Sequence, residues 1–433
     1  IVAELADGKV IAAHTKADGS WVGRQSEIIY DHEYHGEIVN ASLRLDGWDI
    51  APLSSFPAGT WQPAVLAPPR VPDAALRPAQ HPPVRVVETR KAVSITKFTG
   101  SLFGEQDVAV AGTTWVFDFG QNVAGFTELA ATGPKGTAIY LRHGENLEAA
   151  PGPTTSVRNG YCGNSGQRPG SSVDKMCAGS CGSFNLADAH PVPVNVSQVW
   201  GGNCANQTNL FILAGTGFKE TYRPEFTYMG FRYVQVYGWP AGAPDPTEDT
   251  LLQHFVHTDV ARTGLVDLAP VSGNTVGVPD LLNSIQHITL YAQLSNLWSI
   301  PTDCPQRERR GWMGDAHMSS NEAILNNDMH AFYSNFLALI RDDQLLGCQA
   351  ANGAGGSNCG DPALHKGAIA DVTPFTTSPY GGFPGSVVWQ AAYPVIAYNT
   401  WRHYGDVQLL AEHWEGLVEL MDYWLRQPCV KGN

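Results

Sequence analysis

Residues 301–315 read PTDCPQRERRGWMGD, a stretch with many chemically active side chains. Its fifteen residues include three carboxylates, four guanidinium or amide side chains, one Trp and one Cys. Pro301, Pro305 and Gly311 are incompatible with a regular helix through the stretch. The stretch therefore predicts a polar loop, and polar side chains carried on a loop are typical of substrate sites.

Apolar residues recur at helical spacing on both sides of this loop, over residues 278–298 and 329–343. The apolar positions are Leu281, Leu282, Ile285, Ile288, Leu294 and Leu297 in the first segment and Phe332, Phe336, Leu339 and Ile340 in the second. Residues 385–405 and 406–427 predict a helical pair. Gly405 suits the end of its first helix, and Asp406 suits the N-cap of its second.

The earlier part of the chain has the pattern of β-strands. Runs of four to eight residues between Gly or Pro, among them TTWVFDFGQ, AGFTELAATG, GTAIYLRHG, ETYRPEF and GFRYVQVYG, predict an antiparallel β-sandwich over 84–245. A Cys-rich insertion at 150–208 interrupts it. Residues 1–65 resemble the end of another, N-terminal β-sandwich, and the Pro-rich segment 66–83 predicts a linker. The expected fold is thus β-rich first and helical over 246–433.

Charge and hydropathy exclude several classes of partner. The chain has 41 acidic and 27 basic residues, a net charge of −14, which repels phosphate backbones and anionic membrane surfaces. No run approaches the roughly 18 apolar residues of a membrane span. We therefore expect no nucleic-acid and no membrane partner. The fourteen His residues are scattered without ligand spacing, so neither a metal nor another cofactor is predicted.

The cysteines favour an oxidising compartment. Cys162, Cys177, Cys181 and Cys204 lie in the Gly-, Ser- and Asn-rich insertion, and Cys348 and Cys359 bracket a Gly-rich loop. Loop-stapling disulfides are the favoured interpretation, and a zinc site in the insertion is the alternative. Sequons at Asn40, Asn195 and Asn206 also suit a secreted glycoprotein. Cys304, inside the opening stretch, is interpreted as a packing thiol, because no His lies near it in sequence.

The carboxylates of 301–315 suit glycoside hydrolysis. That reaction needs one carboxyl to protonate the leaving oxygen and a second to activate water or attack directly. Glu308, between Asp303 and Asp315, is the candidate acid, although Arg307 and Arg309 lie beside it. A purely structural cluster, in which Asp303, Arg307, Glu308 and Arg310 pair with one another, is the alternative from residue types alone.

DCPQRERRGWMGD resembles the signature segment of the bacterial and fungal α-L-rhamnosidases. The resemblance extends to residues 116–147, to FTYMGFRYVQVYG, to HGEIVNASLRLDGWD and to GSVVWQAAYPVIAYNTWRHYGD, and so covers almost the whole chain. It implies β-sandwich domains followed by an (α/α)6 six-hairpin barrel. It also implies exo-acting, inverting hydrolysis of a terminal α-L-rhamnose from a small molecule or glycan.

Site residues are carried over from the family by position. Glu308 matches the general acid, Asp303 and Asp315 match carboxylates that bind the rhamnose hydroxyls, and Arg307 and Trp312 match contacts to the sugar. Trp389 resembles a ring-packing aromatic, although this chain reads WQAA where the family usually has WGDA. A core aromatic is the alternative for Trp389. Asp371 is expected to cap a loop or form a turn.

The resemblance also implies elements outside this chain. A six-hairpin barrel has about twelve helices, and its general base is a Glu in the later half, whereas only five or six helices are predicted here. We therefore expect a second polypeptide to complete the barrel and supply the base. Two alternatives for function stay open: another inverting six-hairpin glycosidase, and a non-catalytic carbohydrate-binding protein. Activity on a panel of aryl glycosides distinguishes a rhamnosidase from another six-hairpin glycosidase. A carboxylate about 6.5–9.5 Å from Glu308 distinguishes a catalytic protein from one that only binds carbohydrate.

Overall fold

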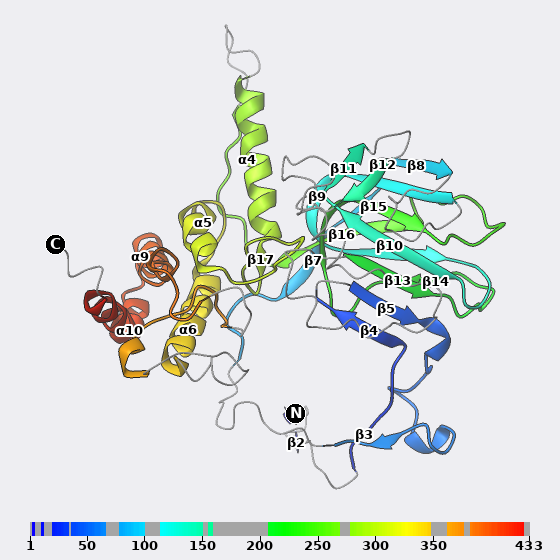
Figure 1. The fold of residues 1–433 in the computed structure, drawn as a ribbon, viewed down its shortest axis with the longest axis horizontal. Coiled ribbons are helices and arrows are strands. Elements are labelled where there is room, and N and C mark those ends of the chain that lie inside the picture. The colour runs from blue at the N-terminus through cyan, green and yellow to red at the C-terminus, as the bar shows by residue number, and fades with distance from the viewer. Residues whose placement is uncertain are drawn as a thin grey trace.

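The computed structural model describes residues 2–4, 10–12, 20–33, 36–65, 78–99, 113–149, 155–158, 207–268, 278–347, 362–375 and 382–427. A β-rich part precedes a helical part, in the predicted order (Figure 1). The predicted cysteine pairs and the sequons at Asn195 and Asn206 lie outside the described residues.

One large sheet dominates the β-rich part. Its main path runs β4-β5-β13-β10-β15-β9-β16-β7, and β8 and β14 also pair with β9. The strands are β4 (Ile28–His32), β5 (Gly36–Asn40), β7 (Val84–Lys91), β8 (Ser94–Thr99), β9 (Thr113–Ala131), β10 (Ala138–Gly144), β13 (Thr208–Ile212), β14 (Glu220–Tyr222), β15 (Met229–Tyr237) and β16 (Leu251–Thr258). Four short pairs lie outside it: β1 (Val2–Glu4) with β2 (Val10–Ala12), β3 (Val22–Gly23) with β6 (Gln62–Pro63), β11 (Asn146–Ala149) with β12 (Thr155–Arg158), and β17 (Leu297–Trp298) with β18 (Ile300–Pro301).

Strand β9 is one long strand with two irregular glycines. The sequence predicts two strands here, over 113–121 and 124–133, but the chain forms one strand of 19 residues. Gly120 adopts a φ of +76°, which a residue with a side chain rarely adopts. A Cβ on Gly125 would lie 1.9 Å from the carbonyl oxygen of His254 on β16. The two glycines therefore allow a left-handed residue and a close backbone contact inside one continuous strand, where the sequence suggested a break.

Strands from the first 65 residues join the same sheet. β5 pairs in parallel with β13, with Ile38 opposite Leu210, and β4 pairs with β5. Buried Glu37 lies at this seam, where Asn209 Oδ1 accepts a hydrogen bond from its backbone N–H at 3.0 Å. Residues 28–40 are therefore hydrogen-bonded to the sheet of the following unit. Short 3₁₀ turns η1 (Ala41–Leu43) and η2 (Leu53–Ser55) follow.

The helical part contains α4 (Val278–Ser295), α5 (Met313–Asn326), α6 (His330–Leu346), η3 (Pro362–His365), α8 (Val387–Gln390), α9 (Ala392–Tyr404) and α10 (Val407–Arg426). The predicted caps are confirmed: Gly405 ends α9 with a φ of +70°, and Asp406 accepts a hydrogen bond from Leu409 N. The first predicted helix ends at Ser295 rather than near Trp298, because the chain turns into the β17–β18 hairpin. None of the helices in these ranges is long and apolar enough to cross a bilayer.

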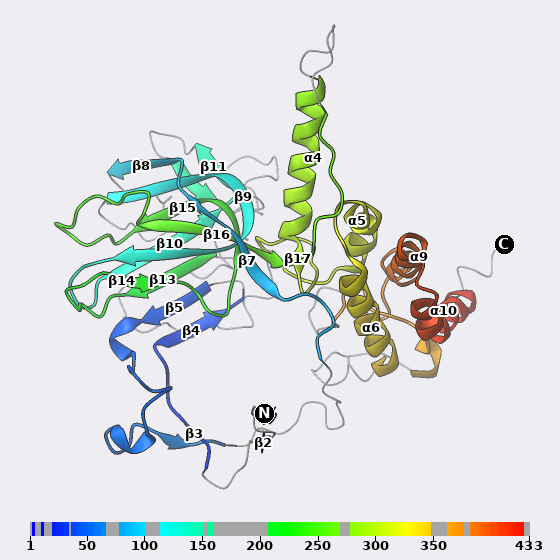
Figure 2. The ribbon, with the colours of Figure 1, turned by 180° about the vertical axis from the view of Figure 1, so that it is seen from behind.

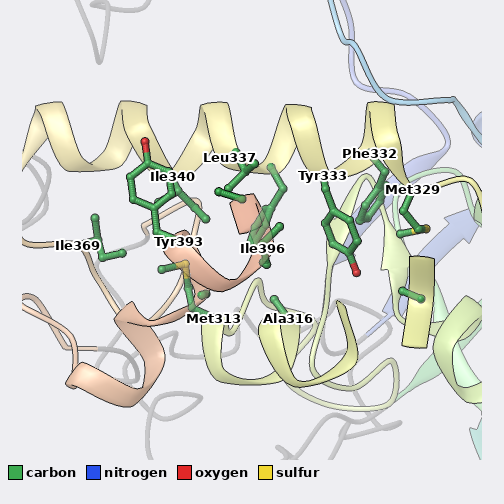
Figure 3. Packing of buried hydrophobic residues seen from close by; sticks show 14 of the residues in the cluster. Met313, Ala316, Met329, Phe332, Tyr333, Leu337, Ile340, Ile369, Tyr393 and Ile396 are labelled. Carbon is green, nitrogen blue, oxygen red and sulfur yellow. The ribbon is translucent and has the colours of Figure 1, made fainter. Parts of the chain in front are cut away.

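Helix α4 lies between the β-rich part and the other helices, as both views show (Figures 1 and 2). One side of α4 packs on the sheet: Tyr291 stacks against Phe255 of β16 with ring centroids 5.4 Å apart. The remaining helices pack on one another around a core that includes Phe332, Leu337 and Tyr393 (Figure 3). Phe332, Phe336 and Ile340, predicted on one face of their helix, are fully buried there.

Candidate active site

Residues 302–312 form a loop between β18 and α5, so most of the stretch 301–315 is a loop as predicted, and its last three residues begin the helix. The loop is closed by backbone hydrogen bonds between its two ends. Asp303 N donates to Arg310 O at 3.1 Å, and Arg309 N donates to Cys304 O at 3.1 Å. In addition, Asp303 Oδ1 accepts a hydrogen bond from Arg310 N at 3.0 Å. Glu308 therefore sits within a small, internally bonded loop.

Cys304 is a neutral thiol in this loop. Its Sγ donates to Asp303 Oδ2 at 2.7 Å, and Glu308 N donates to the same sulfur at 3.4 Å. Burial, followed by the negative charge of Asp303, raises the pKa of the thiol to about 12. A thiol with so high a pKa is a poor nucleophile. This agrees with the interpretation of Cys304 as a packing residue.

Glu308 and Trp312 face each other across one turn. Trp312 Nε1 donates to Glu308 Oε2 at 2.7 Å, and Arg307 Nη2 lies 3.7 Å from Glu308 Oε1. The side chain of Glu308 is 22% exposed, so its carboxyl is held in place and can still be reached from solvent. Trp312 directly precedes α5, and its backbone carbonyl oxygen accepts a hydrogen bond from Ala316 N at 3.0 Å, which joins the backbone of Trp312 to the first turn of the helix.

Asp315 and Trp389 lie on either side of the start of α5. Asp315 is exposed on the first turn, and partial desolvation followed by the negative charge of Glu308 raises the pKa of its carboxyl. The indole of Trp389, in α8, packs against Gly314, where a Cβ would lie 2.7 Å from Cε2. The structure thus brings Trp389 to the loop. Its indole nitrogen is buried and has no hydrogen-bond partner among the described residues.

A second loop supports the first. Met313 N donates to Asp371 O at 2.9 Å, and Thr373 N donates to Gly311 O at 2.9 Å. The carboxylate of Asp371 accepts hydrogen bonds from Gly382 N at 2.9 Å and Ser386 N at 2.7 Å. Asp371 therefore has the loop-capping role expected from the sequence.

The β-rich part also reaches the loop, which the sequence did not indicate. A Cβ on Gly230 of β15 would lie 2.8 Å from Gln306 N, so backbone from the two parts meets there. Glu145, just after β10, accepts a hydrogen bond from Asn122 Nδ2 at 2.9 Å. Burial raises the pKa of Glu145, while Asn122 and then the positive charge of Arg307 oppose the shift. Glu145 is thus a carboxylate from the sheet that faces the loop.

Asp303 gives the loop a pH-dependent stability. Burial raises the pKa of its carboxyl to about 6, from an ordinary value of 3.8. The contribution of this group to stability is therefore complete below the unfolded value and is lost as the pH rises through about 6. We expect the melting temperature of the wild type to fall, relative to that of Asp303→Asn, between pH 4 and pH 7.

Asp249 provides a control whose contribution to stability is expected to stay nearly constant between pH 4 and pH 7, because its lowered pKa lies below this range. Lys91 Nζ lies 2.7 Å from its carboxylate, and that hydrogen bond lowers the pKa of Asp249. Melting curves of Asp303→Asn, Asp249→Asn and the wild type across this pH range give the comparison. A constant difference between Asp303→Asn and the wild type would contradict the assignment.

Among the described residues, no group of three or more His, Cys, Asp or Glu side chains could hold a metal ion. The site therefore consists of a half-buried carboxyl fixed by an indole, further carboxylates close by, and aromatic rings at the start of a helix. Such an arrangement suits proton transfer to a polar, hydroxyl-rich ligand.

Comparison with known proteins identifies the two parts of the chain. Residues 108–257 match the bacterial alpha-L-rhamnosidase concanavalin-like domain, and residues 277–429 match the bacterial alpha-L-rhamnosidase 6 hairpin glycosidase domain. The fold is thus a concanavalin-like β domain followed by six-hairpin glycosidase helices, as predicted. From the order and identity of these two domains, the chain belongs to the bacterial α-L-rhamnosidase family.

Named relatives and solved structures agree. An alpha-L-rhamnosidase of Formosa agariphila is 24% identical over 410 residues, covering 94% of this chain and 34% of the relative. One of Streptomyces avermitilis is 26% identical over 424 residues, covering 98% and 31%. The structures of alpha-L-rhamnosidases from Dictyoglumus thermophilum and Aspergillus terreus both superpose with a TM-score of 0.68, at 30% and 26% identity. They cover 98% of this chain, and the chain covers 37% and 38% of them. The chain thus spans about a third of the length of its curated relatives.

Proposed function

We propose that the protein containing this chain is an exo-acting, inverting α-L-rhamnosidase in which Glu308 is the general acid. The observation that carries the proposal is the 2.7 Å hydrogen bond from Trp312 Nε1 to Glu308 Oε2, within a domain that matches a glycosidase family. This bond holds Oε2, and the other carboxyl oxygen, Oε1, lies 3.7 Å from Arg307 Nη2. The names of the relatives support rhamnose as the sugar.

The roles of the other residues follow from their chemistry. Asp303 and Asp315 are carboxylates beside the acid and are proposed to bind sugar hydroxyls. Trp312 and Trp389 offer ring faces for packing against the sugar, and Arg307 offers hydrogen-bond donors. Glu308 protonates the glycosidic oxygen as the bond to the anomeric carbon breaks. In the same step, a carboxylate from outside residues 1–433 takes a proton from a water that attacks the anomeric carbon from the opposite face, which inverts the configuration.

The test is hydrolysis of an aryl α-L-rhamnoside by the native protein, followed by proton NMR of the first sugar released. The expected first product is β-L-rhamnose. Release of the α-anomer would overturn inversion. A matched panel of other aryl glycosides distinguishes a different six-hairpin glycosidase. Binding of L-rhamnose without any turnover would favour the non-catalytic alternative.

We also propose that helices from outside residues 1–433 cover the outer side of α4. Leu281, Ile285 and Ile288 lie at i, i+4 and i+7, and their exposed fractions are 60%, 47% and 62%. An apolar stripe of this spacing is typical of a helix packed against others. The short span of the chain relative to its relatives supports further barrel helices as the occupant. That these helices belong to a second polypeptide is part of the proposal.

Replacing Ile285 and Ile288 with Gln tests this proposal. We expect the melting temperature of this chain alone to change little, because both side chains are exposed in it. In the native protein, the same change is expected to weaken association with the rest of the barrel and to lower activity. Native and denaturing mass spectrometry measure this association directly. A single active species near 46.7 kDa, without a companion chain, would overturn the proposal.

We further propose that the protein is secreted, with glycans on its sequons and disulfides in its Cys-rich segments. The sequon Asn40 lies at the end of β5, at the edge of a 3₁₀ turn, where Ser42 donates to its side chain. The proposal predicts a mass decrease on enzymatic removal of N-linked glycans. It also predicts that alkylation after reduction adds more mass than alkylation of the denatured, unreduced protein. A reduced, unglycosylated native protein would contradict it.

A further inference from the structure

Three residues other than glycine have left-handed backbone conformations among the described ranges. They are Gln207, Ser299 and Arg309, with φ of +48°, +61° and +52°. Such conformations cost free energy for a residue with a Cβ and persist where the surroundings hold them. All three lie at the junction between the β domain and the loop that carries Glu308.

Arg309 extends from the loop into the β domain. Its Nη2 donates to Gln207 Oε1 at 3.1 Å, and its guanidinium lies over the ring of Tyr228, 4.9 Å from the centroid. Its Nε donates back to Pro305 O at 2.7 Å, which closes the turn of the loop. One side chain therefore ties together the loop backbone, a buried amide and an aromatic ring.

The partners of Arg309 are themselves fixed. Gln207 is fully buried, and its amide exchanges two hydrogen bonds with the backbone of Gly230, at 2.8 and 3.1 Å. Tyr228 stacks on Trp298 with ring centroids 3.9 Å apart. Trp298 belongs to the hairpin that is tied to the sheet by the bond from Ser299 N to Thr258 Oγ1, 2.8 Å long. The guanidinium thus binds a rigid surface rather than a mobile one.

The left-handed conformation at Arg309 separates two neighbouring side chains. Glu308 contacts Trp312 at the start of α5, and the next side chain, Arg309, contacts the sheet. A displacement of Arg309 would therefore shift the backbone that carries the carboxyl of Glu308. Proton transfer is sensitive to such shifts, since a misplacement of about 1 Å can cost about 100-fold in rate.

We propose that Arg309 is a positioning residue for Glu308, through which the β domain sets the placement of the acid. The proposal rests on the proposed function of Glu308. Arg309 touches no reacting atom in this scheme. Its contribution is geometric: the planar guanidinium bonds Gln207 and Pro305 while it stacks on Tyr228. Lysine has no planar fork and cannot make these contacts together.

The experiment compares Arg309→Met and Arg309→Lys with the wild type in the native protein, on two rhamnosides that differ in leaving group. A dinitrophenolate leaves with little protonation, whereas a sugar or alkyl alcohol needs the acid. For Arg309→Met, we expect kcat to fall about 100-fold on the alkyl rhamnoside and by less than about 5-fold on the dinitrophenyl rhamnoside. KM is expected to stay within about 3-fold in both cases, since binding is not the affected step. The kcat of Arg309→Lys on the alkyl rhamnoside is expected to lie between those of Arg309→Met and the wild type.

Arg232→Met is the matched control. Arg232 also stacks on a tyrosine, Tyr233, at 4.9 Å, and makes two hydrogen bonds to Asp118, but all three residues belong to the sheet. The Arg232→Met substitution is expected to change kcat by the same factor on the alkyl and the dinitrophenyl rhamnoside. An equal fall on both substrates for Arg309→Met, or no fall, would overturn the proposal and leave the proposed function intact. A wild type without rhamnosidase activity would instead refute the proposed function.

Discussion

Replacing Glu308 with Gln is expected to lower kcat on an alkyl α-L-rhamnoside by about 1,000-fold, within the range for loss of a general acid. The amide has nearly the same shape as the carboxyl, and its oxygen can still accept the hydrogen bond from Trp312 Nε1. It has no acidic proton for the leaving oxygen. The loss therefore falls on the chemical step, and L-rhamnose binding by calorimetry is expected to stay close to that of the wild type.

Two comparisons make this result specific. Glu415→Gln changes a carboxylate on α10 that is 81% exposed, and it is expected to leave kcat unchanged. A dinitrophenyl rhamnoside is expected to recover much of the activity of Glu308→Gln, because its leaving group needs little protonation. If Glu308→Gln turned over the alkyl substrate at the wild-type rate, Glu308 would have no part in the mechanism.

Local signals were sufficient where the structure depends on local interactions. Apolar spacing predicted α6 and the α9–α10 pair, because each of these helices buries one face. The capping residues placed the boundary of the pair, since α9 ends at Gly405 and α10 begins after Asp406. The loop around Glu308 followed from its prolines and glycine. The sequence motif DCPQRERRGWMGD, rather than any periodic pattern, indicated that this loop belongs to a glycosidase. The sequence could thus predict the site loop and its candidate acid.

Longer-range features could not be predicted in this way. Gln207 and Arg309 are 102 residues apart, and neither belongs to a periodic pattern, so their hydrogen bond has no local signal. The glycines of β9 suggested breaks between two strands. In the structure they lie inside one strand, where Gly125 permits the close approach of the β16 backbone at His254. The spacing in α4 predicted an amphipathic helix correctly, but spacing alone does not tell what covers the apolar side.

Replacing Gly311 with Ala is expected to lower the unfolding free energy by about 3 kcal/mol, at the upper end for overpacking. A Cβ at this position would lie 1.8 Å from Thr373 O and 3.2 Å from Ile300 Cδ1. The carbonyl cannot rotate away as a side chain can, and Thr373 N is bonded to Gly311 O at 2.9 Å. The two loops must therefore separate, and the neighbouring Trp312 must move with them. We expect kcat to fall by about 100-fold as Glu308 loses its placement.

Gly314→Ala and Gly23→Ala separate steric conflict from a general effect of alanine. At Gly314 the nearest atom is Cε2 of the Trp389 indole, 2.7 Å away, and this side chain can shift, so a smaller loss of about 1–2 kcal/mol is expected. At Gly23 nothing lies within 4 Å, and alanine is expected to be neutral or slightly stabilising because it restricts the unfolded chain. Chemical denaturation of the three variants gives the order directly. If Gly311→Ala were as stable as Gly23→Ala, the close contact between the two loops would not hold in solution, and the support that it gives to Trp312 and Glu308 would be lost with it.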